Sequence, residues 1–404
     1  MMESKWIYIR NYLIVILMIL SSKTVYFGLI YVRLTYLALS GICVISLIFS
    51  IHHKTKIKLD NLIVLFVIFV EMTMQFLAYN DQLSSSFIHT FVVTYLPFII
   101  SFFCTALLTK ESYLIKYVNV LIVISLVSLV CFSIAVLNPE LAWAFITKTE
   151  FNNSIYNISP FYTWGWGIHV FARNSGPFWE PGAFQGFIIM AVLFMLFTPG
   201  KHKHVKFKMF VLLATMITTG STTGYILTIV VLFIFHKRFE KLFLEDRSLR
   251  GKNWIKFVVV IMTVGVLFYI VLSNNISDKL VNTNISGMTR KYDFLNGFNV
   301  VFDHPFIGYS FTNARITRLG ELGMTTDISV GLSSLLFTCG IPFGLYYLWR
   351  LYGGLKAFFH PTALEWAGLI VVFVILNCTE VLWWLPVYTV FLFRFSATKE
   401  KYID

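Results

Sequence analysis

The chain has 404 residues, of which 57% are hydrophobic and only 13% are charged, and its mean hydropathy is +0.75. Soluble domains are about a quarter charged, so this composition excludes a soluble enzyme, a coiled coil and a disordered chain. It indicates a polytopic membrane protein. The five cysteines stand singly within apolar runs, which predicts small core side chains rather than metal ligands or disulfides.

Apolar runs fill most of the chain, and a run of about 20 apolar residues can cross a bilayer as a helix. We expect one all-α transmembrane domain over residues 1–404, with eleven or twelve spans and two long outer loops at 138–178 and 273–328. The seventh and eighth helices are short and are joined by Gly220-Ser221-Thr222-Thr223-Gly224, so they form either two spans or one re-entrant pair. The predicted helices cover residues 11–30, 34–51, 61–79, 87–108, 113–137, 181–198, 207–220, 223–236, 254–272, 329–349, 362–378 and 380–395.

The distribution of the basic residues predicts the orientation in the membrane. With a cytoplasmic N-terminus, 23 of the 32 Lys and Arg residues fall on the cytoplasmic side and 9 on the outer side. Cytoplasmic loops of membrane proteins carry this excess of positive charge, so we expect both termini in the cytoplasm. The same distribution explains the net charge of +12 through contacts with anionic lipids, and no nucleic-acid partner is needed.

Arginine is concentrated on the outer side. Five of the nine outer cations are Arg, compared with six of the 23 on the cytoplasmic side. The planar guanidinium group binds carboxylate and phosphate oxygens in pairs, whereas Lys is a flexible point charge. We therefore expect the outer loops 138–178 and 273–328 to form the catalytic face.

The first outer loop ends in a segment that predicts an anion site. Pro181 suits the first position of a helix, and the N-terminus of that helix carries partial positive charge and unpaired N–H groups. Arg173 precedes it across a Gly-Pro turn, and Glu180 stands directly before Pro181. Arg173 and Glu180 form either a structural salt bridge or a pair that holds a phosphate and a hydroxyl group.

The second outer loop contains an amphipathic pattern over Thr289–Phe302, which predicts a helix lying on the membrane surface that Pro305 ends. His304 is a candidate for substrate contact. Glu71, in the middle of the third span, needs a partner inside the bundle. The remaining polar candidates of this loop are Arg290, Arg315, Arg318 and Asp327. The alternative interpretation is an interfacial helix whose cations reach to the lipid headgroups.

Several motifs are absent from the sequence. It has no G-x-x-x-x-G-K-[ST] motif, no dinucleotide-binding glycine pattern and no D-x-D motif for a metal and a nucleotide sugar. These absences predict chemistry without a nucleotide, a metal or another cofactor.

Taken in order, the quoted motifs resemble the O-antigen polymerase (Wzy) family, within the GT-C-like superfamily that also includes the O-antigen ligases. The motifs are Arg173-x-x-Gly176 … Glu180-Pro181, Ser221-Thr222-Thr223-Gly224, Arg290, Pro305-x-x-Gly308-x-Ser310 and Cys339-Gly340-Ile341-Pro342-x-Gly344. The resemblance spans most of the chain. It implies a glycosyltransferase of the bacterial inner membrane that polymerises undecaprenyl-diphosphate-linked oligosaccharide repeats on the periplasmic face, for lipopolysaccharide or capsule-type polysaccharide.

The resemblance also implies roles for the candidate residues. Arg173 and Arg290 would bind the diphosphate, with Arg315, Arg318 and His304 as further substrate contacts. Catalysis would fall to Glu180 or, as second choice, Asp327, which would orient or deprotonate the acceptor hydroxyl. The implied partners are the lipid-linked oligosaccharide and membrane lipids, and a chain-length regulator protein is a candidate partner.

Two other functions remain open. Ligases carry a His-Asn pair shortly before the helix with the Gly-Ile motif, but here that stretch reads Thr326-Asp327-Ile328-Ser329-Val330, which favours a polymerase over a ligase. A flippase for lipid-linked oligosaccharides could also have twelve spans and an Arg-lined cavity. Flippases are usually built from two similar halves, and this sequence shows no internal repeat.

Overall fold

The structure is a computed structural model that describes residues 5–51, 58–79, 85–151, 154–166, 169–170, 173–243, 285–321 and 328–395. Helices dominate these residues. Among them, three helices are long and apolar enough to cross a membrane: Leu59–Ala78, Lys110–Leu137 and Gly331–Phe359. The bent pair Thr222–Ile234 and His236–Leu242 adds a fourth if it counts as one span. The predicted helix at 254–272 lies outside the described residues, as do 273–284 and 322–327 of the second outer loop.

The chain divides into two compact units. The first comprises Met1–Lys23, Phe27–Tyr113 and Ser286–Asp404, and the second comprises Thr24–Tyr26 and Leu114–Ile285. Helix α5 runs from the first unit into the second.

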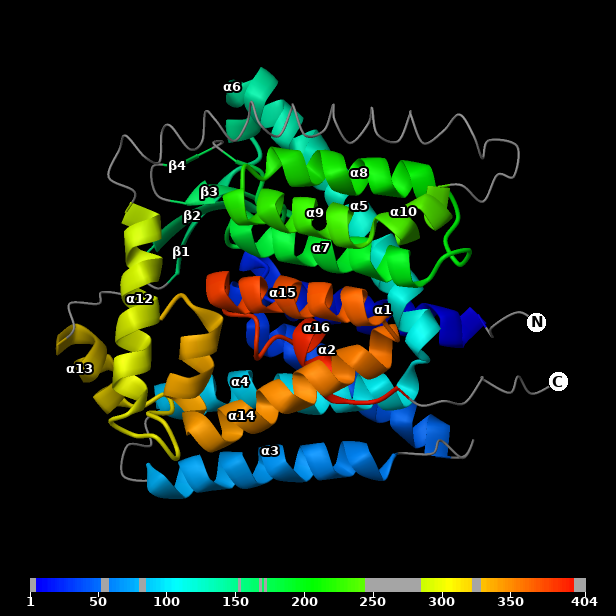
Figure 1. Cartoon of the computed structure of the whole chain (residues 1–404). Helices are drawn as coiled ribbons and strands as arrows, with labels where there is room; N and C mark the ends of the chain where they lie inside the picture. The colour runs from blue at the N-terminus through cyan, green and yellow to red at the C-terminus, as the bar shows by residue number, and fades with distance from the viewer. Residues whose placement is uncertain are drawn as a thin grey trace. The chain divides into compact units, whose positions relative to one another are not determined.

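Helices are the regular elements of the first unit among its described residues (Figure 1). Its elements are α1 (Lys5–Ser21), α2 (Val32–Ile51), α3 (Leu59–Ala78), α4 (Ser85–Leu107), α12 (Ile285–Val301), α13 (Asn313–Glu321), α14 (Gly331–Phe359), α15 (Ala363–Thr379), α16 (Pro386–Thr389) and a 3-10 turn (Val390–Leu392), and a π-helical stretch (Val25–Ile30) precedes α2. Helix α12 matches the helix predicted over Thr289–Phe302. The predicted span 380–395 instead contains only the short α16 and the 3-10 turn, because α15 ends at Thr379 and the extended backbone of Glu380 follows it.

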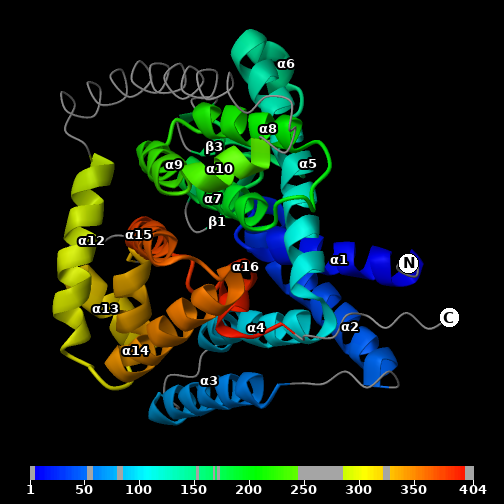
Figure 2. The ribbon, with the colours of Figure 1, turned by 45° about the vertical axis from the view of Figure 1, so that its right-hand side comes forward.

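The second unit combines helices with a small sheet. Its elements are α5 (Lys110–Leu137), α6 (Pro139–Trp143), β1 (Thr147–Phe151), β2 (Ser154–Ser159), β3 (Tyr162–Trp166), β4 (His169–Val170), α7 (Pro181–Phe197), α8 (Val205–Thr218), α9 (Thr222–Ile234) and α10 (His236–Phe243). The strands form an antiparallel sheet in the order β1-β2-β3-β4. Helices α7, α8 and α9 lie side by side in both views (Figure 1 and Figure 2).

The sheet occupies a segment that the sequence analysis treats only as the outer loop 138–178. Its strands are rich in Thr, Ile, Tyr and Trp, the residue types that favour strands. Tyr162 and Trp164 of β3 pack edge to face, with ring centroids 4.8 Å apart, and both are buried beside Ala135 and Ala142. The sheet therefore shares a small core with the end of α5 and with α6.

In the first unit, helix α14 is broken at Gly340 by a segment that is distant in sequence. Gly340 has the non-helical angles φ 76° and ψ 174°, and Gly308 has φ +72°. A side chain at Gly308 would place its Cβ 2.5 Å from the carbonyl oxygen of Thr338. Because Cβ atoms do not approach oxygen that closely, only glycine fits here.

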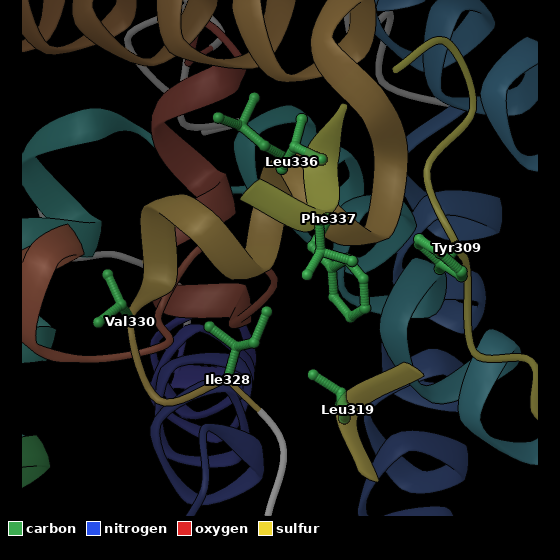
Figure 3. Close-up of a cluster of buried hydrophobic side chains, with 8 residues drawn as sticks. Tyr309, Leu319, Ile328, Val330, Leu336 and Phe337 are labelled. Carbon is green, nitrogen blue, oxygen red and sulfur yellow. The ribbon is translucent and has the colours of Figure 1, made fainter. Parts of the chain in front are cut away.

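Backbone hydrogen bonds join the two segments. Tyr309 N donates to Phe337 O over 2.8 Å, and Ser310 N donates to Thr338 O over 3.0 Å. The rings of Tyr309 and Phe337 lie 4.9 Å apart within a buried cluster that links the end of α12, α13 and the start of α14 (Figure 3). Two motifs that the sequence analysis quotes separately, around Gly308 and Gly340, are thus one structural feature.

Helix α3 buries a single stripe and lies beside α4 and α14 (Figure 1). At its N-terminal end, Asn61 Nδ2 donates to Arg394 O over 2.9 Å and Arg394 N donates to Asn61 Oδ1 over 2.7 Å. Asp60 accepts from Arg350 Nη2 at 2.6 Å and lies 2.8 Å from Arg394 Nε. The buried stripe consists of Asn61, Val64, Ile68, Glu71 and Gln75.

Candidate functional site

The segment before α7 is fixed to the C-terminal end of α8 by one buried asparagine. Asn174 Nδ2 donates to Thr218 Oγ1 over 2.9 Å, and the backbone N–H of Asn174 donates to Thr218 O over 3.0 Å. Its Oδ1 accepts from Gly176 N over 2.9 Å, which closes the turn that leads to Pro181. The preceding residue, Arg173, is therefore held beside the junction of α8 and α9.

Arg173 binds the backbone at that junction. Its Nε donates to Thr219 O over 2.9 Å. The side chain lies against Gly220, which has φ +57°, and a Cβ at Gly220 would lie 3.2 Å from Arg173 Nε. The break between α8 and α9, which the sequence places at Gly220-Ser221-Thr222-Thr223-Gly224, thus holds a guanidinium group.

Two helix N-termini meet at the same place. Gln185 in the second turn of α7 packs on Gly224 in the first turn of α9, because a Cβ at Gly224 would lie 3.0 Å from Gln185 Cβ. The N-terminus of a helix carries partial positive charge and unpaired N–H groups. Pro181 begins α7, as predicted, and Glu180 at its N-cap makes no side-chain cap hydrogen bond. At the start of α9, Ser221 Oγ accepts from Gly224 N over 3.3 Å. Arg173 thus lies next to the N-terminal end of α9, whose first turn packs on α7, and helix N-termini are places where proteins commonly bind anions.

Gln185 is a residue of this site that the sequence analysis missed. Its side chain is 0% exposed, and neither its Oε1 nor its Nε2 has a hydrogen-bond partner among the described residues. A buried amide group without hydrogen bonds costs about 1–3 kcal/mol, so Gln185 is kept at a cost in stability. The signal in the sequence is a single Gln within the otherwise apolar helix Pro181–Phe197.

Glu180 does not take Arg173 as its partner. Glu180 Oε1 accepts a hydrogen bond from Trp179 Nε1 over 2.9 Å, while Arg173 binds Thr219. Burial raises the pKa of Tyr156, and the nearby Glu180 carboxylate raises it further. Glu180 is therefore half-buried and lies near Trp179 and Tyr156. Of the two arrangements left open by the sequence, the structure does not show the salt bridge between Arg173 and Glu180.

In the first unit, Arg315 is buried and bonds two segments that are distant in sequence. The side chain is 4% exposed. Its Nη1 donates to Ser310 O and to Thr338 Oγ1, each over 2.8 Å, and its guanidinium carbon lies 4.8 Å from the ring centre of Phe337. These contacts join the Gly308 segment to the broken helix α14.

His304 is exposed, and Arg318 is partly exposed. Arg318 Nε lies 3.0 Å from Asp303 Oδ2, and its Nη1 lies 3.0 Å from Glu321 Oε2. These two carboxylates raise the pKa of Arg318 and balance its charge. The His304 ring packs edge to face on Tyr309 with 4.3 Å between centroids. Burial, together with the Asp303 carboxylate, raises the pKa of Tyr309.

The two remaining candidates are placed only in part. Arg290 lies in α12, and the structure describes its backbone but not its side chain, whereas Asp327 lies outside the described residues. A carboxylate that the sequence analysis did not select, Asp293, is buried in the same helix and accepts hydrogen bonds from the backbone N–H and the hydroxyl of Ser329. Asp293 thereby fixes the residues that precede α14.

Comparison with known proteins adds no assignment, because neither the protein-family models nor the curated proteins compared with the chain give a match. Among the described residues, no three His, Cys, Asp or Glu side chains gather into a group that could hold a metal ion.

Proposed function

We propose that the chain is a glycosyltransferase that polymerises undecaprenyl-diphosphate-linked oligosaccharide repeats. The observation that carries this proposal is Arg173, bound to Thr219 O beside the N-termini of α7 and α9. A guanidinium group and two helix N-termini suit a diphosphate, which has several charged oxygens to bind. The apolar helices suit a substrate that is carried on a lipid.

The proposed reaction needs no nucleotide, because the sugar–phosphate bond of the donor supplies the driving force. An acceptor hydroxyl oxygen forms a bond to the anomeric carbon of the donor glycan, and the bond from that carbon to the diphosphate oxygen breaks. Negative charge then develops on the leaving lipid diphosphate, where Arg173 and the helix N-termini stabilise it. The buried Gln185 amide offers a further donor to the same oxygens.

A base must take the proton of the acceptor hydroxyl. Glu180 is our first candidate because it stands at the start of α7, next to the proposed diphosphate site, and only its Oε1 is bonded among the described residues. Asp327 remains the second candidate. The outer residues Arg290, Arg315, Arg318 and His304 are proposed as contacts to the glycan or the diphosphate.

The proposal includes an orientation in the bacterial inner membrane. With twelve spans and both termini in the cytoplasm, the Asp60–Arg350–Arg394 cluster at the start of α3 faces the cytoplasm. Gln75 and the Gly308 segment at the other end of α3 then face the periplasm. The excess of Lys on the one side and the Arg enrichment on the other support this orientation.

Reconstitution tests the proposal directly. The purified protein in liposomes is given a synthetic lipid-diphosphate-linked repeat without nucleotide or metal, and products are separated by gel and mass spectrometry. We expect oligomers of two or more repeats with the wild type and with Lys203→Ala, an exposed residue of the second unit, but not with Arg173→Ala. Translocation of single repeats without oligomers would instead indicate a flippase, and transfer to a lipid A-core acceptor would indicate a ligase; either result contradicts the proposal.

A further inference from the structure

Glu71 and Gln75 are buried polar residues in the C-terminal half of the largely apolar helix α3. Helix α3 exposes large apolar side chains such as Phe66 and Phe69 on one face, and it buries Glu71 and Gln75 on the other. An ionisable side chain in the middle of a membrane span is costly and is retained where it has a defined partner. The partner here is Gln75, one turn along the same helix.

Gln75 connects α3 to both segments at the break in α14. Its Nε2 donates to Glu71 Oε1 over 2.8 Å and to Thr338 O over 2.9 Å. Its Oε1 accepts from Ser310 Oγ over 2.9 Å. One amide thus bonds the carboxylate of its own helix, the carbonyl released where α14 breaks, and the hydroxyl of the Gly308 segment.

Ser310 is the residue of that segment most in need of support. It has φ +50°, a left-handed conformation that non-glycine residues adopt at a cost. Its hydroxyl is bonded by Gln75, its N–H donates to Thr338 O, and its carbonyl accepts from Arg315 Nη1 over 2.8 Å. The conformation of Ser310 therefore sets where Arg315 lies.

These contacts form a continuous chain from a carboxylate in α3 to a guanidinium group in the outer segment. Apolar side chains give little preference for one helix–helix register within lipid, so polar contacts fix it. We propose that Glu71 is a positioning residue that orients the Gln75 amide and, through Ser310, fixes Arg315 against the broken helix α14. Its effect on turnover rests on the proposed function, but its effect on structure does not.

Two variants of Glu71 distinguish the effect of its hydrogen bond to Gln75 from the effect of its side-chain bulk. Glu71→Gln keeps an Oε1 that accepts from Gln75, whereas Glu71→Leu keeps the bulk and removes the acceptor. Thr73→Val is the matched control, because Thr73 lies in the same helix and its hydroxyl, among the described residues, bonds Phe69 O of that helix. Ser310→Gly removes the hydroxyl that bonds Gln75, and glycine readily adopts φ +50°. This variant tests the same chain of contacts if Glu71→Leu does not fold.

Hydrogen exchange of the amides of Tyr309 and Ser310, measured in lipid nanodiscs, is the structural test. We expect exchange about tenfold faster in Glu71→Leu, which corresponds to about 1.4 kcal/mol, and several-fold faster in Ser310→Gly. Glu71→Gln and Thr73→Val should match the wild type. Unchanged exchange in both Glu71→Leu and Ser310→Gly would overturn the proposal, as would Glu71→Gln behaving like Glu71→Leu.

The kinetic test uses the reconstituted reaction. A positioning role predicts that Glu71→Leu raises KM for the lipid-linked repeat about tenfold while kcat changes little, and that Glu71→Gln restores KM. If exchange changes as expected but the wild type forms no oligomers, the positioning role stands and the proposed function fails. If the wild type forms oligomers and Glu71→Leu leaves both exchange and KM unchanged, the proposed function stands and the positioning role fails.

Discussion

The two arginine regions of the molecule differ in how completely their polar groups are bonded. Around Arg315 in the first unit, the guanidinium group, Gln75, Ser310 and Thr338 bond one another inside a buried cluster. Around Arg173 in the second unit, the guanidinium Nε binds a backbone carbonyl at a helix junction, and the neighbouring Gln185 amide has no hydrogen-bond partner among the described residues.

This difference distinguishes polar residues that hold the fold from polar residues that are candidates for binding a ligand. A polar cluster whose members bond one another contributes to the fold and fixes its register. A positively charged site with a buried donor left over is suited to take up an external anion. Arg173 is therefore the stronger candidate for a direct role in the reaction, and Arg315 is the stronger candidate for holding the fold of the outer segment.

The largest expected effect concerns Arg173. We expect Arg173→Ala to lower oligomer formation about 100- to 1,000-fold, because removal of one preorganised donor to a developing oxyanion has that effect in other enzymes. Arg173→Lys should recover part of the activity, since Lys carries the charge without the planar fork. Initial rates in liposomes measure both variants. Full activity of Arg173→Ala would show that Arg173 has no direct role in the reaction and so contradict the difference drawn between the two regions.

The second prediction tests the architectural side of the comparison. Gly308→Ala should destabilise the protein by about 1–3 kcal/mol, because it combines a strained backbone with a collision against Thr338 O. Gly353→Ala is the control, since Gly353 has open space around its Cβ position. Thermal unfolding in detergent measures both. Equal midpoints for the two variants would show that the Gly308 contact is not needed for the fold.

A third pair of variants compares a buried arginine with a partly exposed one. Arg315→Gln leaves the Ser310 carbonyl and the Thr338 hydroxyl without their donor, so we expect a clearly lowered unfolding midpoint. Arg318→Gln removes two solvent-exposed ion pairs, which are screened by water, and the midpoint should stay near that of the wild type. A larger drop in the unfolding midpoint for Arg318→Gln than for Arg315→Gln would show that Arg318, and not Arg315, stabilises the fold.

The smallest effect is a dependence of stability on pH. His202, between α7 and α8, is 8% exposed, and burial followed by the charge of Lys208 lowers its pKa to about 4. The unfolded chain binds this proton near pH 6.5 and the folded chain only near pH 4, so the free energy of unfolding should fall as the pH drops through this range. His202→Gln should flatten that slope, which urea titrations at several pH values measure. An unchanged slope would assign the pH dependence to other groups.

Much of the helical pattern could be predicted from the sequence. Long apolar runs mark α3, α5 and the start of α14, and Pro181 marks the start of α7, because each signal is local. The Gly220–Gly224 break is equally local. The sheet over residues 147–170 was missed because its short strands alternate aromatic and polar residues in a stretch that also resembles a polar loop. The span expected at 380–395 failed because hydrophobicity alone does not separate a helix from buried irregular chain.

The candidate site was predictable in its residue types but not in its partners. Arg173 and the start of α7 were identified from local spacing, but the N-terminus of α9 and the Gln185 amide join them through packing between helices. Glu71 was known to need a partner, and the nearest one, Gln75, lies one turn away. Gln75 also bonds Ser310 and Thr338. These bonds depend on the contact between the distant Gly308 and Gly340 segments, which the spacing of residues in the sequence does not reveal.

The two polar attachments of α3 also constrain the surrounding lipid. Asn61 and Gln75 are separated by fourteen residues, a rise of about 21 Å along a helix, while the hydrocarbon layer of a bilayer is about 30 Å thick. In the proposed orientation α3 crosses this layer, and both attachments would then hold their polar groups inside it, so lipids next to this helix would have to compress to keep those groups near water. We would then expect the headgroups of the two leaflets to lie closer together along α3 than elsewhere around the protein.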